Sequence, residues 1–158
     1  MVLPTIKTFS DDYDSIYKQV ENIFKEYNIC QWEKNADGSF SCILNRINTQ
    51  KNNSKIIETD GCCISICKQP KDFNDKAIKK SQHTSLKGCI VKSLKCKLHI
   101  CKYLRETNDL NIKEAITKID LLINLFRLKY DVIWESIPYG SSKKTWLDFY
   151  RMYRSIFL

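Results

Sequence analysis

The chain has 158 residues, of which 43% are hydrophobic, so it can bury a core and is not a disordered tail. Its formal net charge is +8, and the segment 68–105 alone holds eleven basic and two acidic residues, a net charge of +9. The basicity therefore belongs to one segment, and such a field attracts polyanions, either nucleic acid or an anionic membrane surface. Four Gly and three Pro are too few for a loop-rich sandwich or for phosphate-cradling loops.

The eight Cys residues all lie in the first two thirds of the chain. An even number would favour disulfides only in a secreted protein, and the N-terminal sequence has no signal-peptide pattern. No apolar run approaches the roughly 18 residues of a membrane span. We therefore expect no transmembrane segment, a cytoplasmic or nuclear location, and cysteines that are mostly buried thiols.

The first predicted element is an amphipathic helix over residues 11–29. Apolar and aromatic residues recur there at helical spacing, with Ser10 as the predicted cap and Asn28 at the end. The members of this face are Tyr13, Ile16, Tyr17, Val20, Ile23, Phe24 and Tyr27. The helix has one face to bury.

Strands are predicted next. A hairpin turn signal at 35–38 precedes the alternating run 39–47, and a dense run of small β-compatible residues fills the end of 55–68. A further strand is predicted at 85–94, followed by a helix at 95–105. This order predicts an α+β fold, an antiparallel sheet of three to five strands with helices packed on one face.

The remainder is predicted to be helical. A strong apolar stripe runs along 108–130, a breaker stands at 138–142, and a short terminal helix carries an aromatic face. That face holds Trp146, Phe149, Tyr150 and Tyr153, which serve either as core or as a partner-binding helix. We expect two parts: an α+β module at 1–106 and a C-terminal helical extension at 107–158 packed on it.

Enzyme and metal chemistry are poorly supported. The chain has neither a nucleotide-binding Gly pattern nor a Gly-x-Ser-x-Gly elbow, and only two histidines, His83 and His99. Cys89, Cys96, His99 and Cys101 are spaced unlike the paired Cys knuckles of structural zinc sites. We predict a non-catalytic protein with no cofactor and no metal.

Within 68–105, Lys outnumbers Arg ten to one, and Phe73 and Tyr103 are the only aromatic residues. Base readout favours Arg and stacked aromatic rings, whereas Lys acts as a point charge. The segment is therefore better suited to diffuse attraction by an acidic surface than to reading a nucleic-acid sequence.

The first 106 residues resemble the kinase-associated 1 domain, a small α+β module similar to the C-terminal domain of AMP-activated kinase α-subunits. Besides the helix near the N-terminus, the resemblance rests on DGSFSC at 37–42, CISICKQP at 63–70 and SLKGCIVK at 85–92, followed by the helix at 95–105. The chain departs from the family pattern in having no kinase domain, a long loop at 71–84 and the extension after residue 106.

The resemblance implies acidic phospholipid binding through a basic surface, or regulatory packing against a partner. The candidate residues are Lys68, Lys71, Lys79, Lys80, Lys87, Lys92, Lys95 and Lys97. We predict a binding or regulatory module, or a small subunit of a larger assembly, whose Lys-rich face docks on an acidic protein partner. The alternatives are an anionic phospholipid-binding module and a sequence-nonspecific nucleic-acid-binding protein.

Overall fold

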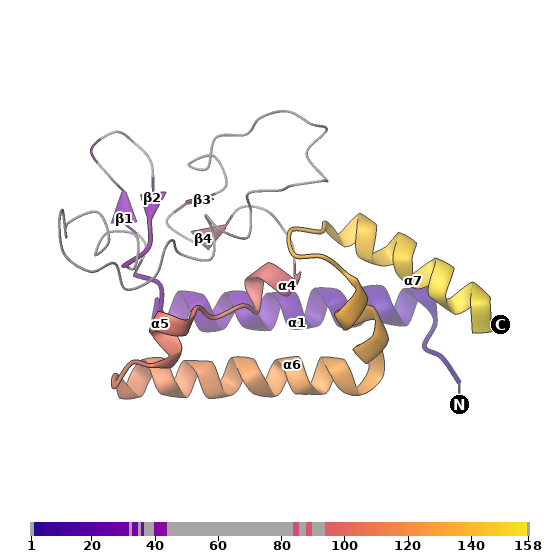
Figure 1. Cartoon of the computed structure of the whole chain (residues 1–158), viewed down its shortest axis with the longest axis horizontal. Coiled ribbons are helices and arrows are strands. Elements are labelled where there is room, and N and C mark those ends of the chain that lie inside the picture. Colours follow the sequence, from indigo (N-terminus) through magenta and orange to yellow (C-terminus); the bar gives the residue numbers. More distant parts are fainter. Residues whose placement is uncertain are drawn as a thin grey trace.

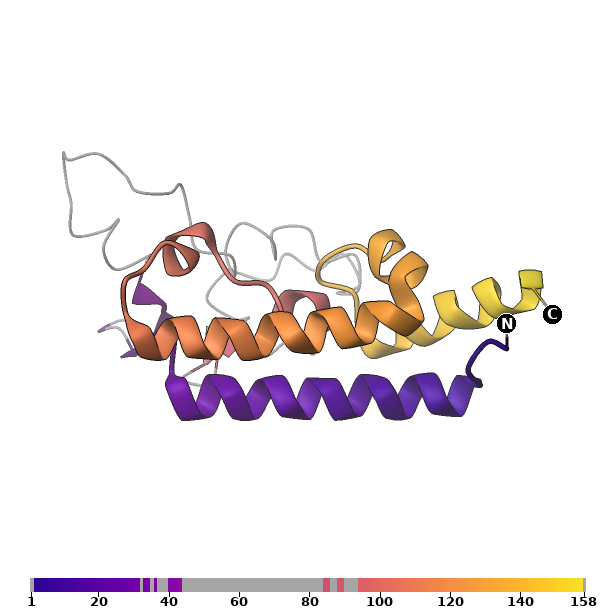
Figure 2. The same cartoon turned by 90° about the horizontal axis from the view of Figure 1, so that it is seen from below.

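Two long antiparallel helices, α1 and α6, lie side by side, and a third, α7, packs across one end of the pair (Figure 1, Figure 2). The computed structural model describes residues 2–31, 33–34, 36, 40–43, 84–85, 88–89 and 94–157. Its main helices are α1 (Ile6–Tyr27), α4 (Leu94–Lys97), α5 (Lys102–Arg105), α6 (Leu110–Ser136) and α7 (Lys143–Phe157).

Helix α1 begins earlier than the sequence pattern predicts. Thr5 is its N-cap, with the side-chain oxygen accepting a hydrogen bond from the Thr8 amide at 3.1 Å, so Ser10 lies within the helix. Asn28 ends it as predicted, with a left-handed φ of 44° and an amide bond to the Phe24 carbonyl. The predicted helix is confirmed, and its start is corrected by about one and a half turns.

Helix α6 is also confirmed, and it is longer than predicted. The Asp109 carboxylate caps it by accepting from the amides of Asn111 and Ile112 at 2.9 and 3.1 Å. The helix is kinked at Tyr130, where φ is −131° and ψ is 33°. Beyond the kink, Trp134 and other buried residues belong to the same core as those before it.

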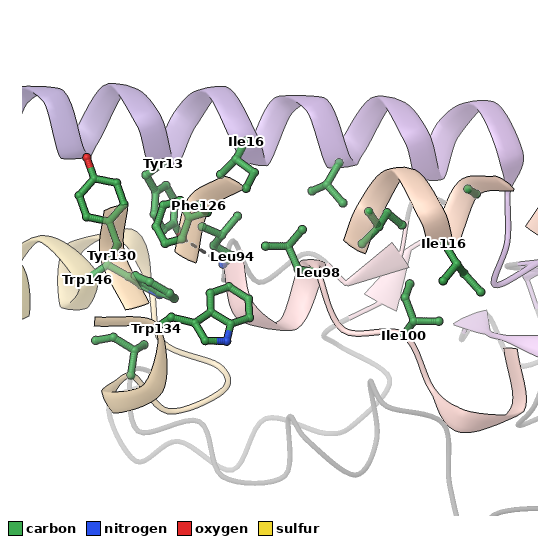
Figure 3. Close-up of a cluster of buried hydrophobic side chains, with 14 of the residues drawn as sticks. Tyr13, Ile16, Leu94, Leu98, Ile100, Ile116, Phe126, Tyr130, Trp134 and Trp146 are labelled. Atoms are coloured by element: carbon green, nitrogen blue, oxygen red, sulfur yellow. Dashed lines mark hydrogen bonds between the residues drawn. The ribbon is translucent and has the colours of Figure 1, made fainter. Parts of the chain in front are cut away.

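Aromatic side chains fill the space where α1, α6 and α7 meet (Figure 3). The ring of Trp146 lies edge-on to those of Tyr13 and Phe126, with centroids 5.6 and 5.9 Å away. Phe9 stacks on Tyr150 at 4.3 Å. Large aromatic rings bury much apolar area, so this cluster stabilises the packing of the three helices.

The helix predicted at 95–105 is two short helices, α4 and α5, with a buried stretch between them. The Tyr13 hydroxyl accepts a hydrogen bond from the Leu94 amide at 3.1 Å, which fixes the start of α4 on α1 (Figure 3). Arg105 donates two hydrogen bonds to Asp120, at 2.9 and 3.1 Å, which join α5 to α6.

The predicted α+β fold with a sheet of three to five strands is wrong for the part of the chain that the structure describes. Extended structure there amounts to two antiparallel pairs, β1 (Glu33–Lys34) with β2 (Phe40–Ser41) and β3 (Thr84–Ser85) with β4 (Gly88–Cys89). The antiparallel pairing across 35–38 is confirmed, but the strand after it stops at Ser41. The strand expected at 55–68 lies outside the described residues.

The physical reason is that the helices cover one another. The buried face of α1 packs on α6, α7 and α4, so no sheet is needed to close it. Helices from both parts of the expected division, 1–106 and 107–158, contribute to one core. Over the described ranges, no helix is both long and apolar enough to cross a membrane.

Candidate docking groove

The predicted anion-binding lysines fall into two groups. Six of them lie outside the described residues: Lys68, Lys71, Lys79, Lys80, Lys87 and Lys92. The other two, Lys95 and Lys97, are both on α4, and each contacts groups of the fold itself.

Lys95 closes the end of α6. Its Nζ donates hydrogen bonds to the carbonyls of Trp134 and Ile137, at 2.9 and 3.1 Å, and lies over the rings of Trp134 and Tyr139. Burial lowers the pKa of this ammonium, an effect that the nearby Glu135 carboxylate partly offsets. A cation that satisfies helix C-terminal carbonyls acts as a structural cap.

Lys97 lies over the aromatic rings of α1. Its Nζ is 5.9 Å from the centroid of Tyr17 and 5.6 Å from that of Phe24, within the range of cation–π attraction. Neither contact prevents Lys97 from also meeting an anion, because its side chain is only partly buried. The structure therefore brings together two of the eight predicted lysines, one of them in a structural role.

The aromatic face of the terminal helix divides between core and edge. Trp146 and Tyr150 are 0% and 1% exposed, so they are core, whereas Phe149 and Tyr153 are partly buried beside them. The indole Nε1 of Trp146 is buried with no hydrogen-bond partner among the described residues, which marks this site as one where ring packing dominates.

The candidate metal ligands do not form a site in the described ranges, where no three His, Cys, Asp or Glu side chains are placed to hold an ion. Cys96 and Cys101 are thiols there, and the Cys96 sulfur accepts a hydrogen bond from the Gly140 amide at 3.0 Å. The His99 ring is half-buried and edge-on to Tyr139. Its pKa is lowered, first by burial and then by the charge of Arg105.

A groove of about 350 Å³ opens between α1 and α6. The lining residues from α1 follow the i, i+3, i+4, i+7 spacing of one helical face, and those from α6 are mostly apolar. The lining residues are Asp12, Ser15, Ile16, Gln19, Leu122, Leu125, Phe126, Leu128, Lys129 and Tyr130. The groove is thus an apolar channel with polar groups along one wall and at one end.

An apolar stripe on the outer side of α6 adjoins this groove. It consists of Leu121, Leu125, Leu128 and Val132, which are 58%, 53%, 82% and 53% exposed and are spaced 4, 3 and 4 residues apart. The spacing places the three leucines along one side of the helix, and Val132 follows just beyond the kink. Single exposed leucines are ordinary, but a contiguous row beside a groove is typical of an interaction surface.

Polar groups meet at the groove's end near Tyr130. The Tyr130 hydroxyl donates to the Asp12 carboxylate at 2.6 Å, and the Lys129 ammonium lies 3.4 Å from the same carboxylate. Burial raises the pKa of Tyr130, and the hydrogen bond to Asp12 raises it further, so the phenol stays a proton donor. The tyrosine therefore holds the carboxylate in a fixed position.

The sequence contains a signal for this surface that the main helical pattern obscures. The apolar spacing over 108–130 predicts one buried stripe, and the leucines at 121, 125 and 128 fall on a different side of the same helix. A second row at spacings of 4 and 3 indicates a helix with two apolar faces. Which face is covered is a property of the fold, since the sequence alone does not say where α1 packs.

Comparisons of the chain with protein-family models, with curated proteins and with solved structures found no match.

Proposed function

We propose that this chain is a non-catalytic binding module, a small subunit that docks on a protein partner through the stripe and groove of α6. The observation that supports it is the row Leu121, Leu125 and Leu128, three leucines more than half exposed in succession beside an open apolar groove. Burying this row removes apolar area from water. Full burial of an exposed Leu contributes about 1.5–3 kcal/mol, and each of these partly exposed leucines contributes the share that matches its remaining exposure. Association is the direct way to cover it.

The Lys-rich segment supports a second contribution to binding. Residues 68–92 hold seven Lys and two Asp, a net charge of +5, which attracts an acidic surface whether protein, anionic phospholipid or nucleic acid. Charge of this kind accelerates encounter and depends on salt, whereas an apolar stripe provides contact area. A protein partner with an acidic rim uses both features, and for that reason we place it first.

Affinity purification of the tagged full chain tests the proposal with two matched triple variants. The first changes Leu121, Leu125 and Leu128 to Gln; the second makes Leu110→Gln, Met152→Gln and Ile156→Gln, which are equally exposed apolar residues away from the groove. We expect a stoichiometric protein partner with the wild-type chain, its loss with the first variant, and its retention with the second.

Two results would contradict this function. The first is the absence of any stoichiometric protein partner, with anionic vesicles or nucleic acid retained instead in a salt-dependent way. The second is a partner that both triple variants retain equally. Circular dichroism of each variant guards against misreading a folding defect, because all six positions are exposed and should tolerate Gln with little loss of stability.

A further inference from the structure

We propose that the groove between α1 and α6 takes an amphipathic helix of the protein partner, with basic residues beside its apolar stripe at the Asp12 end. This inference rests on the proposed function and names the occupant of the same surface. It is carried by the shape of the groove, the charge of its α1 wall and the exposed position of the stripe.

The shape fits a helix. Two neighbouring antiparallel helices form a channel into which the ridge of a third can pack, at interaxial distances of about 8–10 Å. The described wall from Asp12 to Gln19 is about two helical turns long, so it accommodates two or three apolar anchors. Recognition of an amphipathic helix in such a channel relies on anchors at i, i+3, i+4 and i+7, the spacing that both walls show here.

The acidic groups at the Asp12 end favour a basic helix. On the α1 wall, the charged residue in the lining is an aspartate. Asp12 is in the lining itself, and Asp11 is exposed next to it. Lys129 is the lining's own cation, but its 3.4 Å contact with Asp12 is long and its side chain is 56% exposed, so a partner ammonium can take its place.

A second copy of the chain is a poorer occupant. Pairing two copies through this face brings two α1 helices together, each with five acidic and three basic residues. Like charges across an interface disfavour that pairing. A heterologous helix with leucine anchors and lysine flanks instead places positive charges beside Asp12.

The test uses two synthetic helical peptides as probes and the full chain as receptor. Both peptides carry Leu at i, i+3, i+4 and i+7 and differ only in two flanking positions, which are Lys in one and Glu in the other. Fluorescence anisotropy at low salt should show the Lys peptide binding about fivefold more tightly than the Glu peptide, the size expected of exposed charge pairs.

Four receptor variants sharpen the assignment. Asp12→Asn keeps an acceptor for Tyr130 but removes the charge. The ratio of the affinities for the Lys and Glu peptides should therefore fall towards one. Lys129→Gln removes the competing cation, so the preference should grow. Leu125→Gln should weaken the binding of both peptides at least fivefold, whereas Leu110→Gln, on a still more exposed leucine outside the groove, should weaken the binding of neither.

Several outcomes would overturn the inference. Equal or tighter binding of the Glu peptide would refute the preference for a basic helix. If neither peptide binds with a dissociation constant below about 1 mM, an amphipathic helix is not the occupant. Sedimentation showing a dimer that Leu125→Gln dissociates would make a second copy the occupant. These failures are separate from failure of the proposed function, because a partner lost only from the Leu121, Leu125 and Leu128 variant would still establish docking at this face.

Discussion

Lys95 and His99, four residues apart, both contact the Tyr139 ring, and burial is the largest cause of the lowered pKa of each. They differ in what compensates for burial. Lys95 remains bonded to two carbonyls, whereas the further influence on His99 is the positive charge of Arg105, which disfavours a second cation. The fold therefore favours the neutral form of the imidazole, which lowers the pKa of His99.

This arrangement predicts a loss of stability in mild acid. The folded pKa of His99 lies below its ordinary value of 6.5, so as the pH falls through 6.5 the unfolded chain takes up a proton before the folded one does. The free energy of unfolding therefore falls across that window and levels off below the folded pKa. Urea unfolding of wild type and His99→Gln between about pH 8 and about pH 5 measures the effect, which His99→Gln should reduce.

The chain's other histidine supplies the comparison. The sequence predicts His83 to be exposed in a Lys-rich loop, so His83→Gln should keep the wild-type pH dependence. Identical pH profiles for wild type and His99→Gln would show that the burial of His99 does not influence stability. At the residue scale, the sequence predicted Lys95 as a surface cation, because carbonyl partners 39 and 42 residues away leave no local pattern.

The C-terminal end of α6 depends on a side chain that is distant in sequence. Its last turn has no basic residue of its own, and Lys95 of α4 supplies the cation that its final carbonyls lack. α4 is only four residues long and is itself fixed by the Tyr13 hydroxyl. The three elements α1, α4 and α6 therefore stabilise one another through these contacts.

Replacing Lys95 should lower the free energy of unfolding more than replacing Lys97. Lys95→Met keeps the aliphatic stem but loses both hydrogen bonds, and we expect the free energy of unfolding to fall by about 1–3 kcal/mol. Lys97→Met loses only cation–π contacts, so the fall should not exceed about 1 kcal/mol. Chemical denaturation of both variants measures the difference. An equal effect of the two substitutions would refute the capping role.

The long helices were predicted well from this sequence, whereas the predicted sheet of three to five strands is wrong for the described residues. The three helices with sustained apolar spacing, at 11–29, at 108–130 and at the C-terminus, were found, because a period of 3.6 kept over many residues is specific to a helix with one buried face. The run 39–47 alternates for only a few residues. In the structure β2 ends at Ser41, Cys42 is buried and the Ile43 amide bonds to the Cys30 carbonyl, whereas residues 44–47 of the predicted strand lie outside the described ranges.

The whole molecule depends on α7 to close its core. Trp146 and Tyr150 fill the space between α1 and α6. Replacing a buried Trp by Ala lowers the free energy of unfolding by about 3–5 kcal/mol. Small domains are stable by about 5–15 kcal/mol in total. Two such residues therefore account for a large part of the free energy of unfolding.

A chain ending at residue 142 should consequently lose its cooperative fold. We expect weak near-ultraviolet circular dichroism and a broad urea transition, because Phe9 would lose its stacking on Tyr150 and Tyr13 its contact with Trp146. A chain ending at residue 155, which lacks only the exposed Ile156 and Phe157 and the terminal Leu158, is the control and should unfold as the full chain does. A sharp two-state transition in the shorter chain would contradict this view of α7.

The candidate site was less accessible from sequence than the helices were. Charge is visible in composition, so the Lys-rich segment dominated the functional prediction. The groove exists only because α1 packs on one face of α6 and leaves Leu125 and Leu128 uncovered. Such an arrangement depends on pairing between segments about 110 residues apart, for which the chain has no local marker.

The same long-range pairing affects how the protein is made. The Tyr150 hydroxyl and the Arg154 guanidinium both donate to the carbonyl of Pro4, and Phe9 stacks on Tyr150. Helix α1 is synthesised before α7, so its apolar face lacks its native cover until α7 has been translated. The core therefore cannot close while only α1 and α6 have been made, and until then the uncovered face of α1 is prone to nonspecific association.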